Sequence, residues 1–252
     1  MIRSLYIVTG ASRGLGAAMA ERLLAPGTQL LCISRRTSEA LALKAGAANA
    51  RCEQWAMDLA TPLPVAHRLS AWLAQIDHTS FDTATLINNA GVLTRVGPLG
   101  HVDGTDVSNA LRVGLEAPLL LTAAFLRATL TWPTRRRVLQ ISSGLGRRAM
   151  AGQAIYAAAK AGLDHAARTI ALDEALQPNG AKIVSLAPGV IDTEMQARLR
   201  DNPADGFPDQ SHFVNLQRNG GLASPAEAAG KVLAYLDRTD FGSQPVADVR
   251  DA

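Results

Sequence analysis

Residues 5–16 decide the fold, and they read Leu5-Tyr6-Ile7-Val8-Thr9-Gly10-Ala11-Ser12-Arg13-Gly14-Leu15-Gly16. An apolar run ends in a turn with three glycines, and residues 15–24 then have helical spacing. Such a turn between a strand and a helix is typical of nucleotide binding, because the glycines let the backbone approach a pyrophosphate. The helix N-terminus adds free N–H groups and a partial positive charge. Tight turns also need glycine for steric reasons alone, but the position between strand and helix favours a nucleotide.

Strand-like and helix-like segments alternate along the rest of the chain. Further strands are expected at 29–34, 52–56, 85–88, 137–142, 183–187 and 246–249, and helices at 38–45, 64–75, 103–112, 118–129, 153–176 and 225–237. The strands are continuous apolar runs, as expected when helices cover both faces of a sheet. Repeated βα units form a parallel sheet with right-handed crossovers. The sequence therefore predicts an α/β fold, a doubly wound parallel sheet of about seven strands in which ligands bind beyond the carboxyl ends.

No linker, charge block or repeat divides the chain, so we expect one domain over residues 1–252. Residues 1–100 form its mainly cofactor-binding half, and residues 136–252 form the catalytic and substrate-binding half.

The composition argues against several classes of protein. The formal net charge is +3 and aromatic residues make up only 4%, whereas nucleic-acid binders usually concentrate basic charge and interleave aromatic side chains. The five dispersed histidines and the two cysteines, Cys32 and Cys52, lack metal-ligand spacing, so no metal site is expected. The first residues run directly into a strand, and no stretch approaches the ~20 uninterrupted apolar residues of a membrane span. We therefore expect a cytoplasmic protein with neither a nucleic-acid nor a membrane partner.

Tyr156 and Lys160 are four residues apart on a predicted helix, so their side chains share one face. A free tyrosine has a pKa of ~10 and exchanges protons poorly near neutrality. A nearby ammonium favours the phenolate and lowers that pKa. Tyr156 can then act as a general acid towards a carbonyl oxygen, or as a base in the reverse direction. An i,i+4 pair alone is weak evidence, and its context strengthens it.

Five motifs in chain order resemble those of the short-chain dehydrogenase/reductase family. They are Thr9–Gly16, Asn88-Asn89-Ala90-Gly91, Ser143 thirteen residues before Tyr156, the Tyr156/Lys160 pair, and Pro188-Gly189-Val190-Ile191-Asp192-Thr193. The resemblance implies that Ser143, Tyr156 and Lys160 are catalytic, with the Ser143 hydroxyl holding the reacting oxygen. The implied cofactor-binding residues are Gly10, Ser12, Arg13, Gly14, Leu15, Gly16, Ser34, Arg35, Asp58, Leu59, Asn89, Ala90, Gly91, Tyr156, Lys160, Pro188, Gly189, Ile191 and Thr193. Among them, Asp58 matches the residue that contacts adenine, and Ile191 and Thr193 match those that hold the nicotinamide carboxamide.

The cofactor is predicted to be NADP(H). An NAD enzyme usually carries an acidic residue after the second strand to bind the ribose hydroxyls, but this chain has Ser34, Arg35 and Arg36 there. A guanidinium can bind a 2′-phosphate through paired, charge-assisted hydrogen bonds. Arg13 adds a second cation on the same side, although surface arginines are also common at strand ends.

One position departs from the family pattern. The family usually has Asn where this chain has Gly114, within Arg112-Val113-Gly114-Leu115-Glu116-Ala117-Pro118. In the family, the backbone carbonyl of that residue holds a water in the proton relay from Lys160. Glycine keeps the carbonyl and permits an irregular helical turn, so an altered relay is expected rather than inactivity.

Residues 194–222 form a long segment after the sixth strand, and such a segment near a pocket suggests a substrate lid. Surface packing of a helical insertion is the alternative. Candidate substrate residues are Leu145, Met195, Phe207, Phe213 and Asp248, although Asp248 is equally compatible with a solvated tail. The apolar residues of the segment favour an apolar or aromatic carbonyl compound over a sugar.

The stretches 85–91 and 188–197 resemble the subgroup of sepiapterin and bacterial benzil reductases. That subgroup implies an NADPH-dependent carbonyl reductase that transfers a hydride to a ketone or vicinal dicarbonyl. A 3-oxoacyl or steroid-type reductase and a catalytically weakened NADPH-binding protein remain alternatives. The apolar helices at 118–130 and 153–176 suggest a homodimer or homotetramer.

Overall fold

The computed structural model describes residues 3–201 and 207–251. Its centre is a seven-stranded sheet in the order β3-β2-β1-β4-β5-β6-β7, and every neighbouring pair is parallel. The strands are β1 (Ser4–Thr9), β2 (Thr28–Ser34), β3 (Arg51–Ala56), β4 (Thr83–Asn88), β5 (Arg135–Ile141), β6 (Lys182–Ala187) and β7 (Val246–Asp248). The order reverses between β1 and β4, so the first βα turn and the Asn88–Gly91 segment lie side by side at this switch point. The predicted doubly wound single domain is confirmed.

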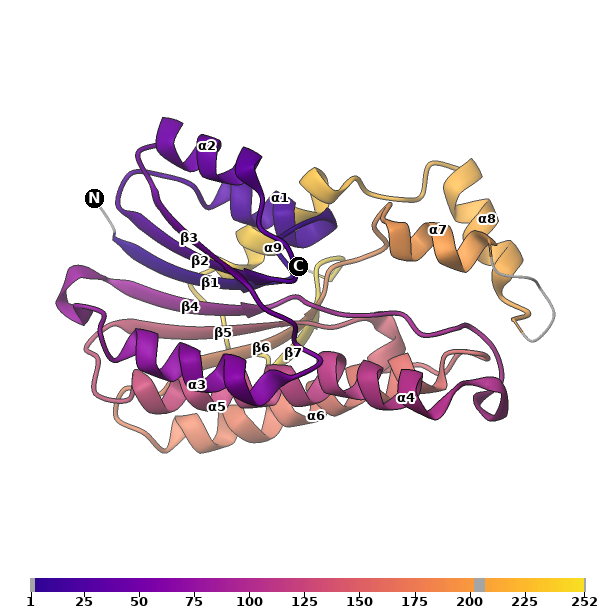
Figure 1. The fold of residues 1–252 in the computed structure, drawn as a ribbon. Coiled ribbons are helices and arrows are strands. Elements are labelled where there is room, and N and C mark those ends of the chain that lie inside the picture. The colour runs from indigo at the N-terminus through magenta and orange to yellow at the C-terminus, as the bar shows by residue number, and fades with distance from the viewer. Residues whose placement is uncertain (1–2, 202–206, 252) are drawn as a thin grey trace.

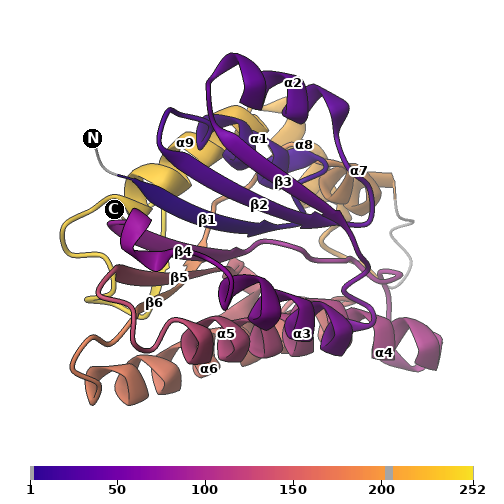
Figure 2. The same ribbon diagram turned by 60° about the vertical axis from the view of Figure 1, so that its left-hand side comes forward.

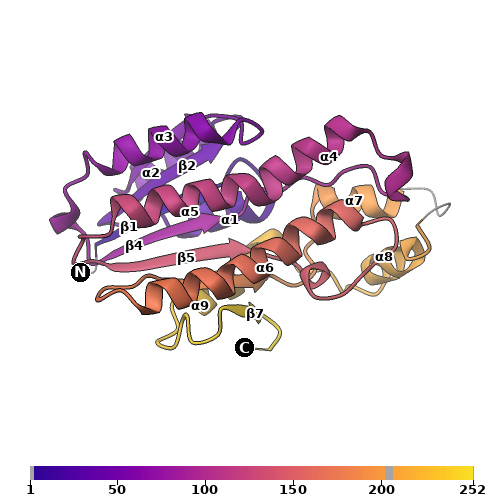
Figure 3. The same ribbon diagram turned by 90° about the horizontal axis from the view of Figure 1, so that it is seen from below.

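Helices cover both faces of the sheet (Figures 1 and 2). One layer holds α1 (Gly14–Arg22), α2 (Glu39–Ala47) and α9 (Pro225–Leu236). The other layer holds α3 (Pro62–Leu73), α4 (Gly104–Leu111), α5 (Ala117–Ala128) and α6 (Ala154–Ala175), and α4, α5 and α6 are seen from below in Figure 3. Beyond the carboxyl ends of the strands lie α7 (Glu194–Asp201) and α8 (Gln210–Arg218).

Alternation along the buried strands divides the core in two. Leu5 and Ile7 pack into a cluster under α3, α5 and α6, whereas Val8 packs into a cluster under α1 and α9. Strand residues of opposite parity point to opposite faces of a sheet. The continuous apolar runs in the sequence therefore reflect two buried faces, as predicted.

Local signals set several helix boundaries. Ser38 caps α2 by accepting a hydrogen bond from the Leu41 N–H at 3.2 Å, and Asp103 caps α4 in the same way. Ser224 and Glu227 form a reciprocal capping box at the start of α9.

The predicted helices at 103–112 and 118–129 are joined in the structure by a π-helical turn, Arg112–Glu116, into one helical stretch. By length and composition, the stretch Gly104–Ala128 is apolar enough to span a membrane. Half of its most apolar window is buried inside the protein, where it packs against α3 and α6, which is typical of a core helix.

Candidate active site at the carboxyl edge of the sheet

The Gly-rich turn is packed directly against the Asn88–Gly91 segment. Gly10 and Gly14 have φ angles of +68° and +56°, a region that strongly favours glycine. A Cβ on Gly10 would lie 2.9 Å from the Ala90 Cα, and a Cβ on Gly16 would overlap the Gly10 carbonyl oxygen. The glycines are therefore required by the backbone conformation and the close packing of the turn, and the turn together with the Asn88–Gly91 segment is called the cradle below.

Thr9 and Asn89 join the two segments. The Thr9 hydroxyl accepts hydrogen bonds from the N–H groups of Asn89 and Ala90, each at 3.0 Å. The Asn89 side chain donates to the Thr9 carbonyl at 2.9 Å. The preceding Asn88 is buried and donates to the Thr122 hydroxyl on α5 at 3.2 Å. The segment therefore links the ends of the central strands β1 and β4 to α5.

The N-terminus of α1 begins at Gly14, beside this cradle. The cap residue Arg13 pairs its guanidinium with Glu194 on α7 and makes no side-chain hydrogen bond that caps α1. A helix N-terminus with a Gly-rich approach fits the pyrophosphate of a dinucleotide. Thr193 lies close by, because its Cγ2 is 3.7 Å from the Cβ position of Gly14. The turn and the start of α7 are thus in contact.

The predicted adenosine-binding residues follow β2 and β3, two neighbouring strands. Ser34 is buried, and its carbonyl accepts a hydrogen bond from the Met57 N–H at 2.9 Å. Arg35 and Asp58 are exposed just beyond these strand ends. The Asp58 carboxylate accepts from the Ala60 N–H at 2.9 Å, which fixes the loop after β3. Ser34, Arg35 and Asp58 therefore lie at the carboxyl edge of the sheet, as expected for residues that follow parallel strands.

The segment after β6 completes the cofactor side. Gly189 has φ +81°, and Ile191 is buried and forms a β-bridge with Ala223. The bridge holds the chain so that α7 begins directly after Thr193. The predicted cofactor residues follow five strands, β1, β2, β3, β4 and β6, and therefore line the carboxyl edge of the sheet.

Ser143, Tyr156 and Lys160 come together beside that edge. The Lys160 Nζ lies 5.6 Å from the centroid of the Tyr156 ring and donates a hydrogen bond to the Ile141 carbonyl at 2.7 Å. Ser143 follows β5, and its hydroxyl accepts from the Leu145 N–H at 3.2 Å. Gly91 borders the same space, because its Cβ position is 3.9 Å from the Lys160 Nζ.

The surroundings shift the pKa values of both titratable groups. Burial raises the pKa of Tyr156, and hydrogen bonding with Ser143 opposes that rise. Burial lowers the pKa of Lys160 to about 8, and the charge of Asp164 opposes that fall. The pKa of Tyr156 is therefore raised in the protein alone, in contrast to the lowering expected from the sequence.

Gly114 lies in the π-helical turn between α4 and α5, where it is buried against α6. Its Cβ position is 3.2 Å from the Ala159 Cβ, so the turn and α6 are in close contact. The irregular turn expected at this glycine is present, and it lies beside the helix that carries Tyr156 and Lys160.

The predicted lid consists of α7 and α8, although residues 202–206 lie outside the described residues. Val96, Leu199, Phe207 and Phe213 form a separate apolar cluster, with Met150 at its margin. Phe207 is completely buried there, and its ring lies 5.6 Å from that of Phe213 in a stacked arrangement. These two residues therefore build the interior of the lid.

Met195, in the first turn of α7, and Leu145, two residues after Ser143, are only partly buried. Asp248 is buried at the end of β7, where its carboxylate is held by Arg250 in two side-chain hydrogen bonds of 2.8 and 2.6 Å. Arg147 approaches the same carboxylate at 3.6 Å. Asp248 is therefore part of an ion-pair network rather than a solvated tail residue.

The sequence interpretation missed three charged residues near the site. Arg147 joins the Asp248 network, and Glu194 pairs with Arg13. Asp164 is buried one helical turn after Lys160 on α6. Only Asp164 had a recognisable signal, because it lies four residues after Lys160 on the same helix.

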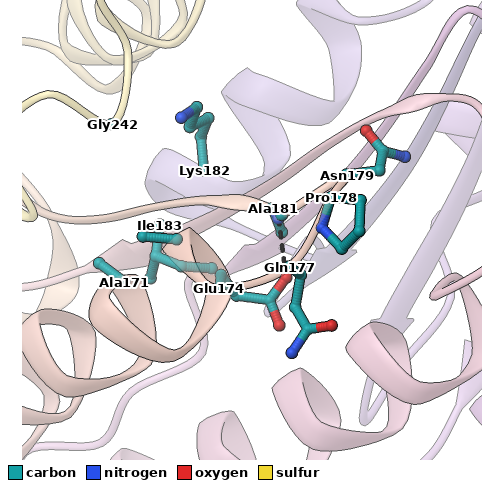
Figure 4. A pocket seen from close by; sticks show the side chains of 11 residues that line it. Ala171, Glu174, Gln177, Pro178, Asn179, Ala181, Lys182, Ile183 and Gly242 are labelled. Carbon is teal, nitrogen blue, oxygen red and sulfur yellow. Dashed lines mark hydrogen bonds between the residues drawn. The ribbon is translucent and has the colours of Figure 1, made fainter.

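A hollow of about 370 Å³ lies at the other end of the sheet, between the end of α6 and the start of β6. Figure 4 shows Glu174 there, with its carboxylate accepting a hydrogen bond from the Ala181 N–H at 2.7 Å. Glu174 also pairs with the buried Arg136 at 3.2 Å. Because the predicted motifs gather at the opposite strand ends, this hollow is separate from the candidate active site.

Comparisons with known proteins agree with this arrangement. The family model for short chain dehydrogenases matches residues 4–204. Benzil reductase ((S)-benzoin forming) from Bacillus cereus is 32% identical over 235 residues, which cover 93% of this chain and 94% of that enzyme. Sepiapterin reductase from Rattus norvegicus is 33% identical over 260 residues, covering 97% and 95%.

A solved structure of a short-chain dehydrogenase/reductase from Burkholderia vietnamiensis is 36% identical, with a TM-score of 0.66 and coverage of 99% of this chain and 98% of that chain. These matches extend over nearly the whole chain, and the motifs occupy the strand ends where the fold places a cofactor and a reacting carbonyl. The protein therefore belongs to the short-chain dehydrogenase/reductase family of oxidoreductases.

Proposed function

We propose that the protein is an NADPH-dependent carbonyl reductase that converts a ketone or vicinal dicarbonyl with apolar or aromatic substituents into an alcohol. The observation that carries this proposal is the convergence of Ser143, Tyr156 and Lys160 beside the Gly-rich turn. The benzil and sepiapterin reductases among its relatives support a small carbonyl substrate.

The residues of the cradle fit a dinucleotide, with the first turn of α1 at the pyrophosphate and Ile191 and Thr193 at the nicotinamide. A bound nicotinamide supplies the hydride that adds to the carbonyl carbon. The Ser143 hydroxyl donates a hydrogen bond to the carbonyl oxygen as negative charge develops there. The Tyr156 hydroxyl then transfers its proton to that oxygen, which completes the alcohol.

Lys160 supports this transfer electrostatically. Its buried ammonium lies beside the Tyr156 ring and favours the phenolate that proton transfer leaves behind. The reverse reaction uses the same groups, with Tyr156 as the base.

A preference for NADPH over NADH is proposed from the cations at the adenosine side. Arg35 follows β2 in the place where an acidic residue would bind a ribose diol, and Arg13 lies in the adjacent turn. A 2′-phosphate there would meet two guanidinium groups, one of which must leave Glu194. Comparable Kd values for NADPH and NADH in a fluorescence titration would contradict this preference.

For the substrate, we propose contacts with Leu145 and Met195, which border the catalytic edge. Phe207 and Phe213 act indirectly, by holding the lid together. Asp248 reaches a substrate only if that substrate displaces Arg147 or Arg250 from its carboxylate.

We further propose that the enzyme is cytoplasmic and forms a homodimer or homotetramer through α5 and α6. Leu172 lies on α6 and Leu176 is its C-terminal cap residue, and they are 71% and 83% exposed, which is unusual for neighbouring leucines. Light scattering distinguishes the two assemblies from a monomer.

The test is NADPH oxidation in the presence of aromatic diketones, sepiapterin-like pterins, 3-oxoacyl thioesters and steroids, with Tyr156→Phe as the control. Reduction of a diketone by the wild type and its loss in the variant is the expected result. If a 3-oxoacyl thioester or a steroid is reduced faster than the diketones, the proposed class of ketones and vicinal dicarbonyls is wrong and that compound's class takes its place. Tight NADPH binding without reduction of any compound would favour a binding protein instead of an enzyme.

A further inference from the structure

Asp164 is a buried carboxylate with an unusual set of neighbours. It lies on α6, is only 1% exposed, and accepts short hydrogen bonds from Ser142 and Ser185 at 2.5 and 2.7 Å, both on Oδ1. Its Oδ2 has no hydrogen-bond partner among the described residues, and the Arg147 Nε lies 3.9 Å away. A buried carboxylate is unfavourable unless hydrogen bonds and opposite charges compensate for the lost hydration.

Asp164 and Lys160 hold consecutive residues at the end of β5. Lys160 donates to the carbonyl of Ile141, and Asp164 accepts from the hydroxyl of the next residue, Ser142. The residue after that is Ser143, which carries the hydroxyl proposed to bind the reacting oxygen. Two side chains one turn apart on α6 therefore fix the backbone from which Ser143 projects.

The same carboxylate acts on the charge of Lys160. Residues four apart on a helix have Cβ atoms about 5–6 Å from each other, and the negative charge of Asp164 counteracts the effect of burial on the lysine. The space around Asp164 is tightly filled, since a Cβ on Gly146 would lie 2.8 Å from its Oδ2. Little room remains for water to screen this interaction.

We infer that Asp164 is a positioning residue: it fixes the Ser142–Ser143 corner against α6 and supplies the negative charge that keeps Lys160 protonated for the reaction. This inference rests on the proposed reductase function, since it assigns a role within that site. Asp164 acts through Lys160 and Ser143 and need not touch the substrate.

Among the described residues, Asp164 is the main anionic neighbour of Lys160, and the other groups packed around the lysine are as follows. On α6 itself the titratable neighbour is Tyr156. The loop after β5 contributes Arg147, β7 contributes Asp248 by way of Arg147, and β6 contributes the uncharged Ser185. The π-helical turn and the Asn88–Gly91 segment present glycines, which carry no charge.

The deciding variant is Asp164→Asn, which keeps an oxygen acceptor for both serines and removes the charge. The chain has only four lysines, at positions 44, 160, 182 and 231, so ¹³C-lysine NMR can follow the titration of Lys160 in the whole protein. We expect the proton affinity of Lys160 to fall about tenfold in this variant. The control is Ser142→Ala, which keeps the carboxylate. In this variant the proton affinity of Lys160 should stay within a factor of about two of its wild-type value.

Activity gives the second measurement. With its proton affinity reduced tenfold from a pKa of about 8, Lys160 would be mostly deprotonated at pH 8. We expect kcat/KM of Asp164→Asn to fall about fivefold at pH 8 and to change little at pH 6. A loss of the same size at every pH, with an unchanged Lys160 midpoint, would reduce Asp164 to a structural residue and overturn the inference.

Arg147→Gln covers the case in which Asp164→Asn does not fold. It removes the cation that competes for the Asp164 carboxylate and should move the Lys160 midpoint to higher pH. An unchanged midpoint would overturn the electrostatic role. Because the NMR titration needs no substrate, the expected shifts in a protein that reduces no carbonyl would refute the proposed function and leave the charge coupling established.

Discussion

Replacing Lys160 by methionine should change how the stability of the protein depends on pH. The structure lowers the pKa of Lys160 from its ordinary value of 10.5 to about 8, because burial penalises the charged form. Between these two pH values the unfolded chain binds more protons than the folded chain, so the free energy of unfolding rises with pH in this window. The charged lysine costs about 3 kcal/mol at pH 7, and about 2 kcal/mol of that is recovered by pH 9.5.

Urea denaturation at pH 7.0, 8.0, 9.0 and 9.5 measures this difference. The wild type should gain about 2 kcal/mol more stability than Lys160→Met across the series. Comparing slopes removes the effect of losing the hydrogen bond to Ile141, which shifts the variant at every pH. Lys231→Met, at an exposed position on α9, is the matched control and should follow the wild type. Parallel curves for the wild type and Lys160→Met would show that Lys160 is not held in a site that disfavours its charge.

Three further substitutions test other parts of the site. Glu194→Gln should free the arginine of the Gly-rich turn and tighten NADPH binding up to about fivefold, as expected for one exposed ion pair, while Glu21→Gln, in an ion pair on another surface, should leave the Kd unchanged. A tighter Kd in both variants would point to net charge instead. Gly16→Ala should abolish dinucleotide binding because its Cβ overlaps a backbone oxygen. Its control is Gly46→Ala, where an added Cβ meets nothing within 4 Å, and this variant should stabilise α2 by about 0.5–1 kcal/mol. If Gly16→Ala still bound the dinucleotide, the close packing of the Gly-rich turn would be refuted. Gly114→Asn should change turnover and its pH dependence by no more than about tenfold, and identical profiles would make that position irrelevant to proton transfer.

The fold was predictable because its signals are local. Periodicity and glycine turns depend on a few consecutive residues, and the expected strand and helix boundaries differ from the structure by a few residues. The motifs sit at strand ends, so the order of a parallel sheet was enough to predict their meeting. The Arg13–Glu194 pair joins residues 181 positions apart, and the Arg147–Asp248 contact joins the loop after β5 to the last strand. Such pairs form because the fold brings distant segments together, and a pattern of a few consecutive residues cannot predict them.

The lid shows the same limit for apolar residues. The sequence showed that residues 194–222 contain several apolar residues, but it could not say whether the aromatic side chains face a substrate or one another. The structure stacks Phe207 on Phe213 inside the lid. Burial of a large aromatic side chain in its own cluster stabilises the helices that present Met195, so specificity can depend on residues that a substrate never touches.

The glycine at position 114 bears most directly on whether the site is catalytic. A decayed site would be expected to lose the local backbone geometry together with the usual asparagine, yet the turn is still π-helical, with the Ala117 N–H donating to the Arg112 carbonyl. A π-turn contains one residue more than an α-helical turn, and such turns inside helices occur frequently at functional sites. Only the backbone of this residue takes part in the implied relay, and glycine retains that backbone. The close approach of α6 also leaves little room for a side chain here, because a Cβ at position 114 would lie 3.2 Å from the Ala159 Cβ. The substitution of glycine for asparagine is therefore weak evidence against catalysis.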